Sequence, residues 1–193
     1  LQFPVTIGSV GIDWFDVLEL NDVLIRDPQK AKMIYVGELI VDFKVLSFLN
    51  TKVEIDKVVL KNGGVKMIRY KTGKINMNQF VDAIIKLTAS DKKDTTTSPP
   101  FKIAKIRLEN MYFHNEDLQE PLIAKYFDHY HFGFEHVNGD ISDFYVHEDT
   151  FRIKVANLNT IERQTKLKVH SLNTIFTLSD HRMEFKDLNA DIG

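Results

Sequence analysis

The stretch that decides the fold is residues 51–85, TKVEIDKVVLKNGGVKMIRYKTGKINMNQFVDAII. Its first apolar residues, Val53, Ile55, Val58 and Leu60, follow an apolar-x-apolar-x-x-apolar-x-apolar rhythm. Four side chains with that spacing scatter around a helix, because a helix turns 100° per residue. On a strand, one β-bulge between Ile55 and Val58 returns all four side chains to one face and bends the strand. The spacing therefore predicts a bulged, bent strand.

The same stretch continues with a turn and a helix. Asn62-Gly63-Gly64 predicts a β-hairpin, because glycine accepts the positive φ that tight turns require. Asn76 is a candidate helix cap, and Gln79 three residues later completes a capping box. The apolar residues after the cap are spaced as one buried helical stripe: Met77, Phe80, Val81, Ile84 and Ile85. We therefore expect one main α-helix near residues 76–89, with Arg69 anchoring the loop before it.

The bulge rhythm recurs along the whole chain. A skip separates apolar residues at positions 5–7 and 10–12, 18–20 and 23–25, 101–103 and 106–108, 132–134 and 137, 167–169 and 172, and in frayed form within 185–192. Residues 45–49 are too closely spaced for alternation and predict a short helical turn. Residues 91–100, DKKDTTTSPP, predict a flexible loop, and the rhythm resumes directly after them. We therefore expect a single domain over residues 1–193 with a mainly β fold, a curved antiparallel sheet that forms a groove with one apolar face.

Composition excludes several classes of protein. The chain of 193 residues has a formal net charge of -2 and a pI near 6.4, so it has no basic surplus for binding nucleic acid. The absence of cysteine excludes disulfides and thiolate metal sites. No apolar run reaches the roughly 18 residues that span a bilayer, and no signal peptide is recognisable. Because the patterned segments run to both ends, we expect a fragment of a longer protein.

The densest group of possible metal ligands is Asp128, His129 and His131. His136 is five residues beyond His131, about 16 Å along a strand, and is too far away to share an ion. With only two close histidines, a solvated strand face is the favoured interpretation, and we predict no metal and no cofactor. No nucleophile elbow, zinc-protease motif, phosphate loop or dinucleotide fingerprint is present, so an enzyme is not expected.

The order of these elements resembles the N-terminal region of the AsmA-like and TamB (translocation and assembly module) family of envelope proteins. The likeness rests on the bulged strand, the second strand, the spacing Arg69-x-x-x-Gly73-x-x-Asn76 and the helix. It continues after the polar loop through KIAKIRLENMYF (102–113) and DHYHFGFEHVNGDI (128–141). Residues 178–193 depart from the pattern, because they lack a Gly-Phe pair near Met183 to Phe185.

This resemblance implies a non-enzymatic protein whose apolar β-groove crosses the periplasm. The implied role is phospholipid transport between the inner and outer membranes, or outer-membrane biogenesis and protein secretion together with a barrel protein of the outer membrane. The implied location is the periplasm, with an inner-membrane anchor upstream of Leu1. The implied partners are phospholipid acyl chains, and the candidate groove residues are Val53, Ile55, Val58, Leu60, Ile103, Ile106, Leu108, Phe132 and Phe134.

The alternative is that these side chains form a closed core. On the pattern alone this interpretation is favoured, because buried apolar stripes usually serve packing. The chain would then be a β-rich scaffold or protein-interaction module of the envelope without lipid cargo, docking other proteins at its sheet edges. The two interpretations differ in whether the concave face is open.

Overall fold

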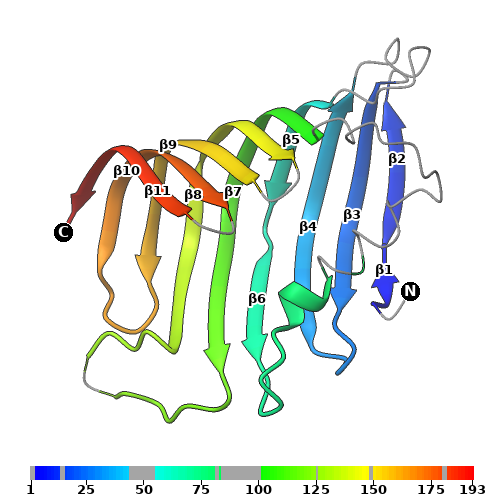
Figure 1. The fold of residues 1–193 in the computed structure, drawn as a ribbon. Coiled ribbons are helices and arrows are strands. Elements are labelled where there is room, and N and C mark those ends of the chain that lie inside the picture. The colour runs from blue at the N-terminus through cyan, green and yellow to red at the C-terminus, as the bar shows by residue number, and fades with distance from the viewer. Residues whose placement is uncertain are drawn as a thin grey trace, which may run out of the picture.

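The computed structural model describes residues 3–13, 16–43, 55–80, 83, 101–124, 126–147, 150–179 and 182–193. Over these residues, eleven strands belong to one sheet (Figure 1). The strands are β1 (Val5–Thr6), β2 (Ser9–Asp13), β3 (Val17–Arg26), β4 (Lys32–Phe43), β5 (Ile55–Lys61), β6 (Gly64–Arg69), β7 (Phe101–Asp117), β8 (His131–His147), β9 (Thr150–Glu162), β10 (Lys168–Ser179) and β11 (Arg182–Ile192). The predicted mainly β fold is confirmed.

The sheet is mixed, so the prediction of an antiparallel sheet is wrong at β7. The main path of neighbouring strands is β1-β3-β4-β5-β7-β8-β9-β10-β11, with β2 beside β3, and β6 between β4 and β7. β7 pairs in parallel with β5 and β6, whereas all other pairs are antiparallel. A parallel pair requires a long crossover connection. The segment between β6 and β7 provides it.

Asn62-Gly63-Gly64 is not a hairpin. β5 and β6 both pair with β4 on one side and β7 on the other, so they are two halves of one interrupted strand. A Cβ atom on Gly63 would lie 2.1 Å from the carbonyl oxygen of Tyr35, and one on Gly64 would lie 2.1 Å from that of Tyr112. The glycines therefore allow β4 and β7 to approach the interruption closely, and they do not reverse the chain.

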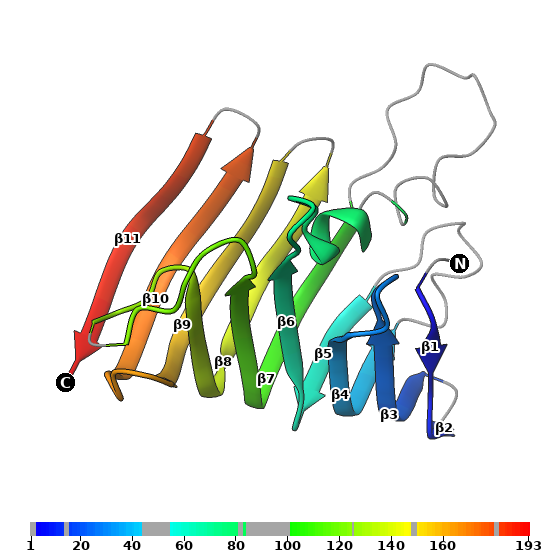
Figure 2. The same ribbon diagram turned by 90° about the horizontal axis from the view of Figure 1, so that it is seen from below.

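Bulges bend the sheet where the sequence rhythm skips. The pairing register shifts between Ile55 and Lys57, between Phe134 and Val137, and between Val169 and Leu172. Between Ile103 and Ile106 of β7 the pairing register with β5 and β8 does not shift. The reason is that β5 and β8 have irregularities of their own at the positions that pair with this part of β7. Residues with φ of 50–54° on or between the strands include Asp22, Asn62, Asn110, His136, Asn157 and Asp187. The strands turn part-way along their length at these positions, and the sheet forms a trough (Figure 2).

Asparagine side chains hold the bulges across neighbouring strands. The Asn110 side-chain amide donates to Asn62 Oδ1 at 2.9 Å. The backbone N–H of Asn110 donates to Asn138 Oδ1 at 2.8 Å, and that of Asn157 donates to Asn173 Oδ1 at 2.9 Å. These bonds satisfy amides that a bulge removes from the strand ladder. The bends are therefore fixed by specific hydrogen bonds.

The helix begins at Asn76, but its described part is short. Residues 76–80 and 83 are helical and lie on the concave side of the sheet beside β4 and β6 (Figures 1 and 2). The remainder of the predicted helix at 76–89 lies outside the described residues, as do the predicted turn at 45–49 and loop at 91–100.

The Asn76 side chain does not cap the helix but links the helix to β6 through hydrogen bonds. Its side chain is fully buried, accepts a hydrogen bond from the backbone N–H of Ile68 at 2.9 Å and donates one to the carbonyl of Lys66 at 3.0 Å. The predicted capping box is not formed, since the side-chain amide of Gln79 donates to the carbonyl of Ile75 at 3.5 Å. Asn76 therefore occupies the place of a neighbouring strand beside β6. The predicted loop anchor Arg69 pairs with Asp117, with 3.5 Å between Nη1 and Oδ2.

Candidate functional site: the concave face

Successive side chains of a strand point to opposite faces of the sheet, and the apolar ones of β5 and β7 lie on the concave face. Val58 and Leu60 of β5 lie opposite Ile106 and Leu108 of β7, in parallel register. Val58 and Ile106 are buried, whereas Leu60 and Leu108 are half-buried and pack against the buried core residues Val23, Val36 and Met111. The other described candidates, Ile55, Ile103, Phe132 and Phe134, are half-buried, and Val53 lies outside the described residues.

The convex face carries charged side chains at β5, β7 and β8. Lys57 of β5 lies opposite Lys105 of β7, and both side chains are exposed. Arg107 Nε and Nη2 donate to the two carboxylate oxygens of Asp140 at 2.9 and 3.2 Å. This pairing holds the pKa of Asp140 below its usual range. Val59 and Ile40 lie on the same face as Arg107, so this face carries charged side chains but is not wholly polar, as the sequence pattern predicts.

Phenylalanine rings form two rows on the concave face, one on each limb of the trough. In the first aromatic row, the Phe132 ring centroid lies 6.0 Å from Phe113, 5.8 Å from Phe134 and 5.8 Å from Phe127. The second aromatic row comprises Phe144, Phe151, Phe176 and Phe185, with successive centroid distances of 5.5, 6.1 and 4.9 Å. The candidate residues named from the sequence include only Phe132 and Phe134. The plain alternation of Phe151 with Ile153 and Val155 is the sequence signal that indicates the second row.

The described strands form a single layer. Every substantial contact between them joins sheet neighbours, so no second sheet of described residues lies on the concave face. Apolar residues are exposed at both ends of the sheet: Val10 and Ile12 of β2 are 61% and 70% exposed, and Met183 and Phe185 of β11 are 64% and 53% exposed. The described strands therefore form an open trough and not a sandwich.

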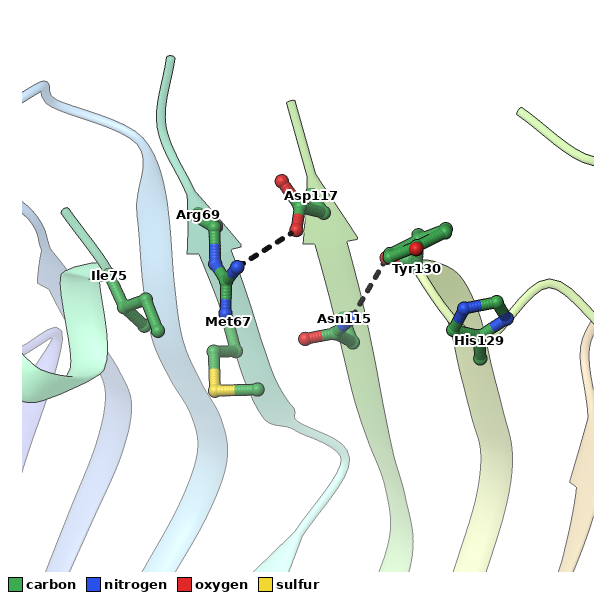
Figure 3. Close-up of a pocket in the computed structure, with 7 residues that line it drawn as sticks. All are labelled: Met67, Arg69, Ile75, Asn115, Asp117, His129 and Tyr130. Carbon is green, nitrogen blue, oxygen red and sulfur yellow. Dashed lines mark hydrogen bonds and ion pairs between the residues drawn. The ribbon is translucent and has the colours of Figure 1, made fainter. Parts of the chain in front are cut away.

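A polar hollow of about 240 Å³ lies where β6 and β7 end (Figure 3). Its lining consists of Met67, Arg69, Ile75, Asn115, Asp117, His129 and Tyr130. The Asn115 side-chain amide donates to the carbonyl of Tyr130 at 2.8 Å. Because Asn115 pairs with Phe132 across β7 and β8, the hollow is directly beside the first aromatic row. An apolar surface therefore leads into a site that contains one arginine and the aspartate with which it pairs.

Asp128 and His131 hold a loop together. Asp128 is buried and accepts hydrogen bonds from the backbone N–H groups of Ile123 at 2.8 Å and Tyr130 at 3.0 Å. His131 contacts Asp128 Oδ2 through Nδ1 at 3.0 Å and the carbonyl of Asp117 through Nε2 at 2.8 Å. His129 is exposed. Among the residues that the structure describes, no three His, Cys, Asp or Glu side chains are placed to hold a metal ion.

Asp128→Asn is expected to destabilise the chain at neutral pH and to have little effect near pH 2. Burial alone would raise the pKa of Asp128, but the hydrogen bonds from Ile123, Tyr130 and His131 lower it to about 2. An unfolded aspartate has a pKa of about 3.9, so the carboxylate stabilises the fold above about pH 4, and this contribution is lost as the pH falls through about 2. Urea unfolding midpoints of the parent and the variant should converge on acidification. A gap that is independent of pH would contradict this assignment.

No protein-family model matches the chain, and no curated protein matches it. In the part of the chain that the structure describes, no helix has the length and apolar character needed to cross a bilayer.

Proposed function

We propose that the concave face binds the acyl chains of lipids and that the chain is a segment of a non-enzymatic lipid-conducting groove. The observation that carries this proposal is the single-layer trough, whose inner face combines two aromatic rows with aliphatic side chains. Exposed contiguous apolar surface is rare on soluble monomers unless it binds something. An acyl chain is linear and apolar, as the trough is.

The polar hollow supplies a place for the head group in this proposal. The Arg69 side chain is about half exposed, and its Nη1 lies 3.5 Å from Asp117 Oδ2. A guanidinium has five N–H donors, so among the described residues donors remain for a phosphate. A phosphate there would lie beside the first aromatic row, which would hold the chains. The resemblance to the AsmA-like and TamB family supports the same role, and extends it to phospholipid transfer across the periplasm from an inner-membrane anchor to an outer-membrane barrel partner.

A second candidate function is protein docking at a sheet edge. β11 is the last strand on the path, and its concave side chains Met183, Phe185, Leu188 and Ile192 are all exposed. Such an edge is suited to strand addition by another polypeptide. In that case the inner face would serve as an extended protein interface.

A photo-crosslinking experiment distinguishes the two functions. A benzophenone amino acid replaces Phe132 on the concave face or, as a control, Lys154 on the exposed convex face. After illumination of protein purified from cells, we expect phospholipid adducts at position 132 and none at position 154, as measured by mass spectrometry. Equal lipid adducts at both positions, or protein adducts alone at position 132, would refute lipid binding in the trough.

A further inference from the structure

Four connections at one end of the strands form a continuous surface, which we call the loop rim. It comprises residues 27–31, 70–74, 118–124 with 126–130, and 163–167, and all lie at the lower end of the sheet in Figure 1. Hydrogen bonds link each connection to the next: Tyr70 Oη donates to Asp27 Oδ2 at 2.5 Å, Gln119 Nε2 donates to the carbonyl of Lys71 at 3.4 Å, and Gln164 Nε2 donates to the carbonyl of Ile123 at 2.7 Å. The loop rim is therefore one connected surface.

The loop rim presents positive charge although the whole chain is acidic. Its carboxylates Asp27 and Asp128 are buried and accept hydrogen bonds from their own loops. Glu120 is the one exposed carboxylate among its described residues. The exposed cations are Lys30, Lys71, Lys74, Arg163 and Lys166. Because five exposed cations outnumber the one exposed carboxylate among the described residues, the outer surface of the loop rim attracts anions.

The loop rim also exposes large apolar side chains. Leu122 and Tyr126 are 78% and 75% exposed, and Leu118, Phe127 and Leu167 are exposed as well. Exposure of apolar side chains to water is unfavourable. Basic residues around exposed Leu, Phe and Tyr are typical of surfaces that lie in the interface of an anionic bilayer. Tyrosine in particular prefers the head-group region.

We propose that the loop rim docks on the surface of an anionic lipid bilayer, with Leu122 and Tyr126 in the interface and the cations on lipid phosphates. The Phe127 ring contacts Phe132 in the first aromatic row, so docking would bring that row to the membrane surface. This inference goes beyond the proposed function, because the loop rim would bind a bilayer even if the trough held no lipid. An acidic protein is the rival partner, and it would not require Leu122 to enter an apolar phase.

Vesicle flotation with two matched triple variants tests the electrostatic part. K71Q/K74Q/K166Q removes three exposed cations from the loop rim, and K57Q/K105Q/K154Q removes three exposed cations from the convex face. Each lysine at an anionic surface contributes about fivefold to binding. We therefore expect the first variant to lose roughly a hundredfold in affinity for mixed phosphatidylcholine–phosphatidylglycerol vesicles, while the second stays close to the parent. Circular dichroism verifies that both variants fold.

A single-cysteine label tests insertion, since the chain has no cysteine of its own. A bimane on L122C should shift to shorter wavelength when mixed vesicles are added, whereas one on K154C should not. The proposal is overturned if the parent does not float with these vesicles, if the two triple variants lose equal affinity, or if the L122C label does not shift. Lipid adducts at position 132 are a separate measurement, so failure here and failure of the trough proposal are distinguishable.

Discussion

Gly63→Ala should destabilise the chain by at least about 3 kcal/mol, or prevent folding. The added Cβ would lie 2.1 Å from the carbonyl oxygen of Tyr35 and 2.6 Å from the Cα of Val36. Both atoms belong to the backbone of β4, so relief requires β4 to move away from the interruption between β5 and β6. Overpacking that forces side chains and backbone to shift typically costs about 1–3 kcal/mol and occasionally more. Because both clashing atoms are backbone atoms, we expect a loss at the upper end of that range or beyond it. Urea unfolding followed by circular dichroism measures the loss.

Gly11→Ala is the matched control for this substitution. Gly11 is also a strand glycine, but the nearest atom to its added Cβ is the Cβ of Glu19 at 3.8 Å, an ordinary contact. We expect a change within about 0.5 kcal/mol, as for most surface substitutions. If Gly63→Ala unfolds at the same urea concentration as Gly11→Ala, then the close approach of β4 does not constrain position 63.

Replacement of Asn76 should have the second largest effect, about 2–4 kcal/mol for Asn76→Ala. The substitution leaves the N–H of Ile68 and the carbonyl of Lys66 without their partner, and it removes the contact of 3.3 Å between Asn76 Nδ2 and Asp27 Oδ2. A buried polar group left unsatisfied costs about 1–3 kcal/mol. Alanine has the higher helix propensity, so the loss cannot come from the helix itself.

Asn76→Asp distinguishes hydrogen bonding of Asn76 to β6 from a helix-capping role. Aspartate is as good an N-cap as asparagine, so a capping role predicts a neutral change. If Asn76 links the helix to β6, the new carboxylate cannot donate to the carbonyl of Lys66 and would face the carboxylate of Asp27. We then expect a loss of stability at least as large as for Asn76→Ala. Asn78→Ala, on the exposed side of the same helical segment, should be neutral. Thermal unfolding of the three variants decides between the roles.

The sequence rhythm predicted the curvature because a skipped residue has one simple structural meaning. An apolar pair displaced by one position must either leave the core or restore its face with a bulge. The register shifts at Ile55–Lys57 and Val169–Leu172 are the second outcome. The same rhythm does not encode strand direction, which is why the parallel pairing of β7 with β5 and β6 was not predicted.

The roles of Gly63, Gly64 and Asn76 depend on contacts with distant parts of the sequence. Gly63 and Gly64 have the composition of a turn, but the space they leave is filled by the backbones of β4 and β7, which belong to distant parts of the sequence. Asn76 likewise has the position of a cap, yet its partners are in β6. The positive charge of the loop rim could not be predicted from the sequence, because it depends on the burial of Asp27 and Asp128. Composition does not show which carboxylates are buried.

Among the described strands, the substantial contacts all join sheet neighbours, which gives the sheet a one-dimensional architecture. As in solenoids, stability is then close to a sum of terms for each strand and each junction, and disruption at one edge need not spread to the other. Growth by whole hairpins would lengthen such a molecule while its cross-section stayed constant. The length of the trough and its width could therefore evolve independently. The number of strands sets the length, and the position at which each strand bends sets the width.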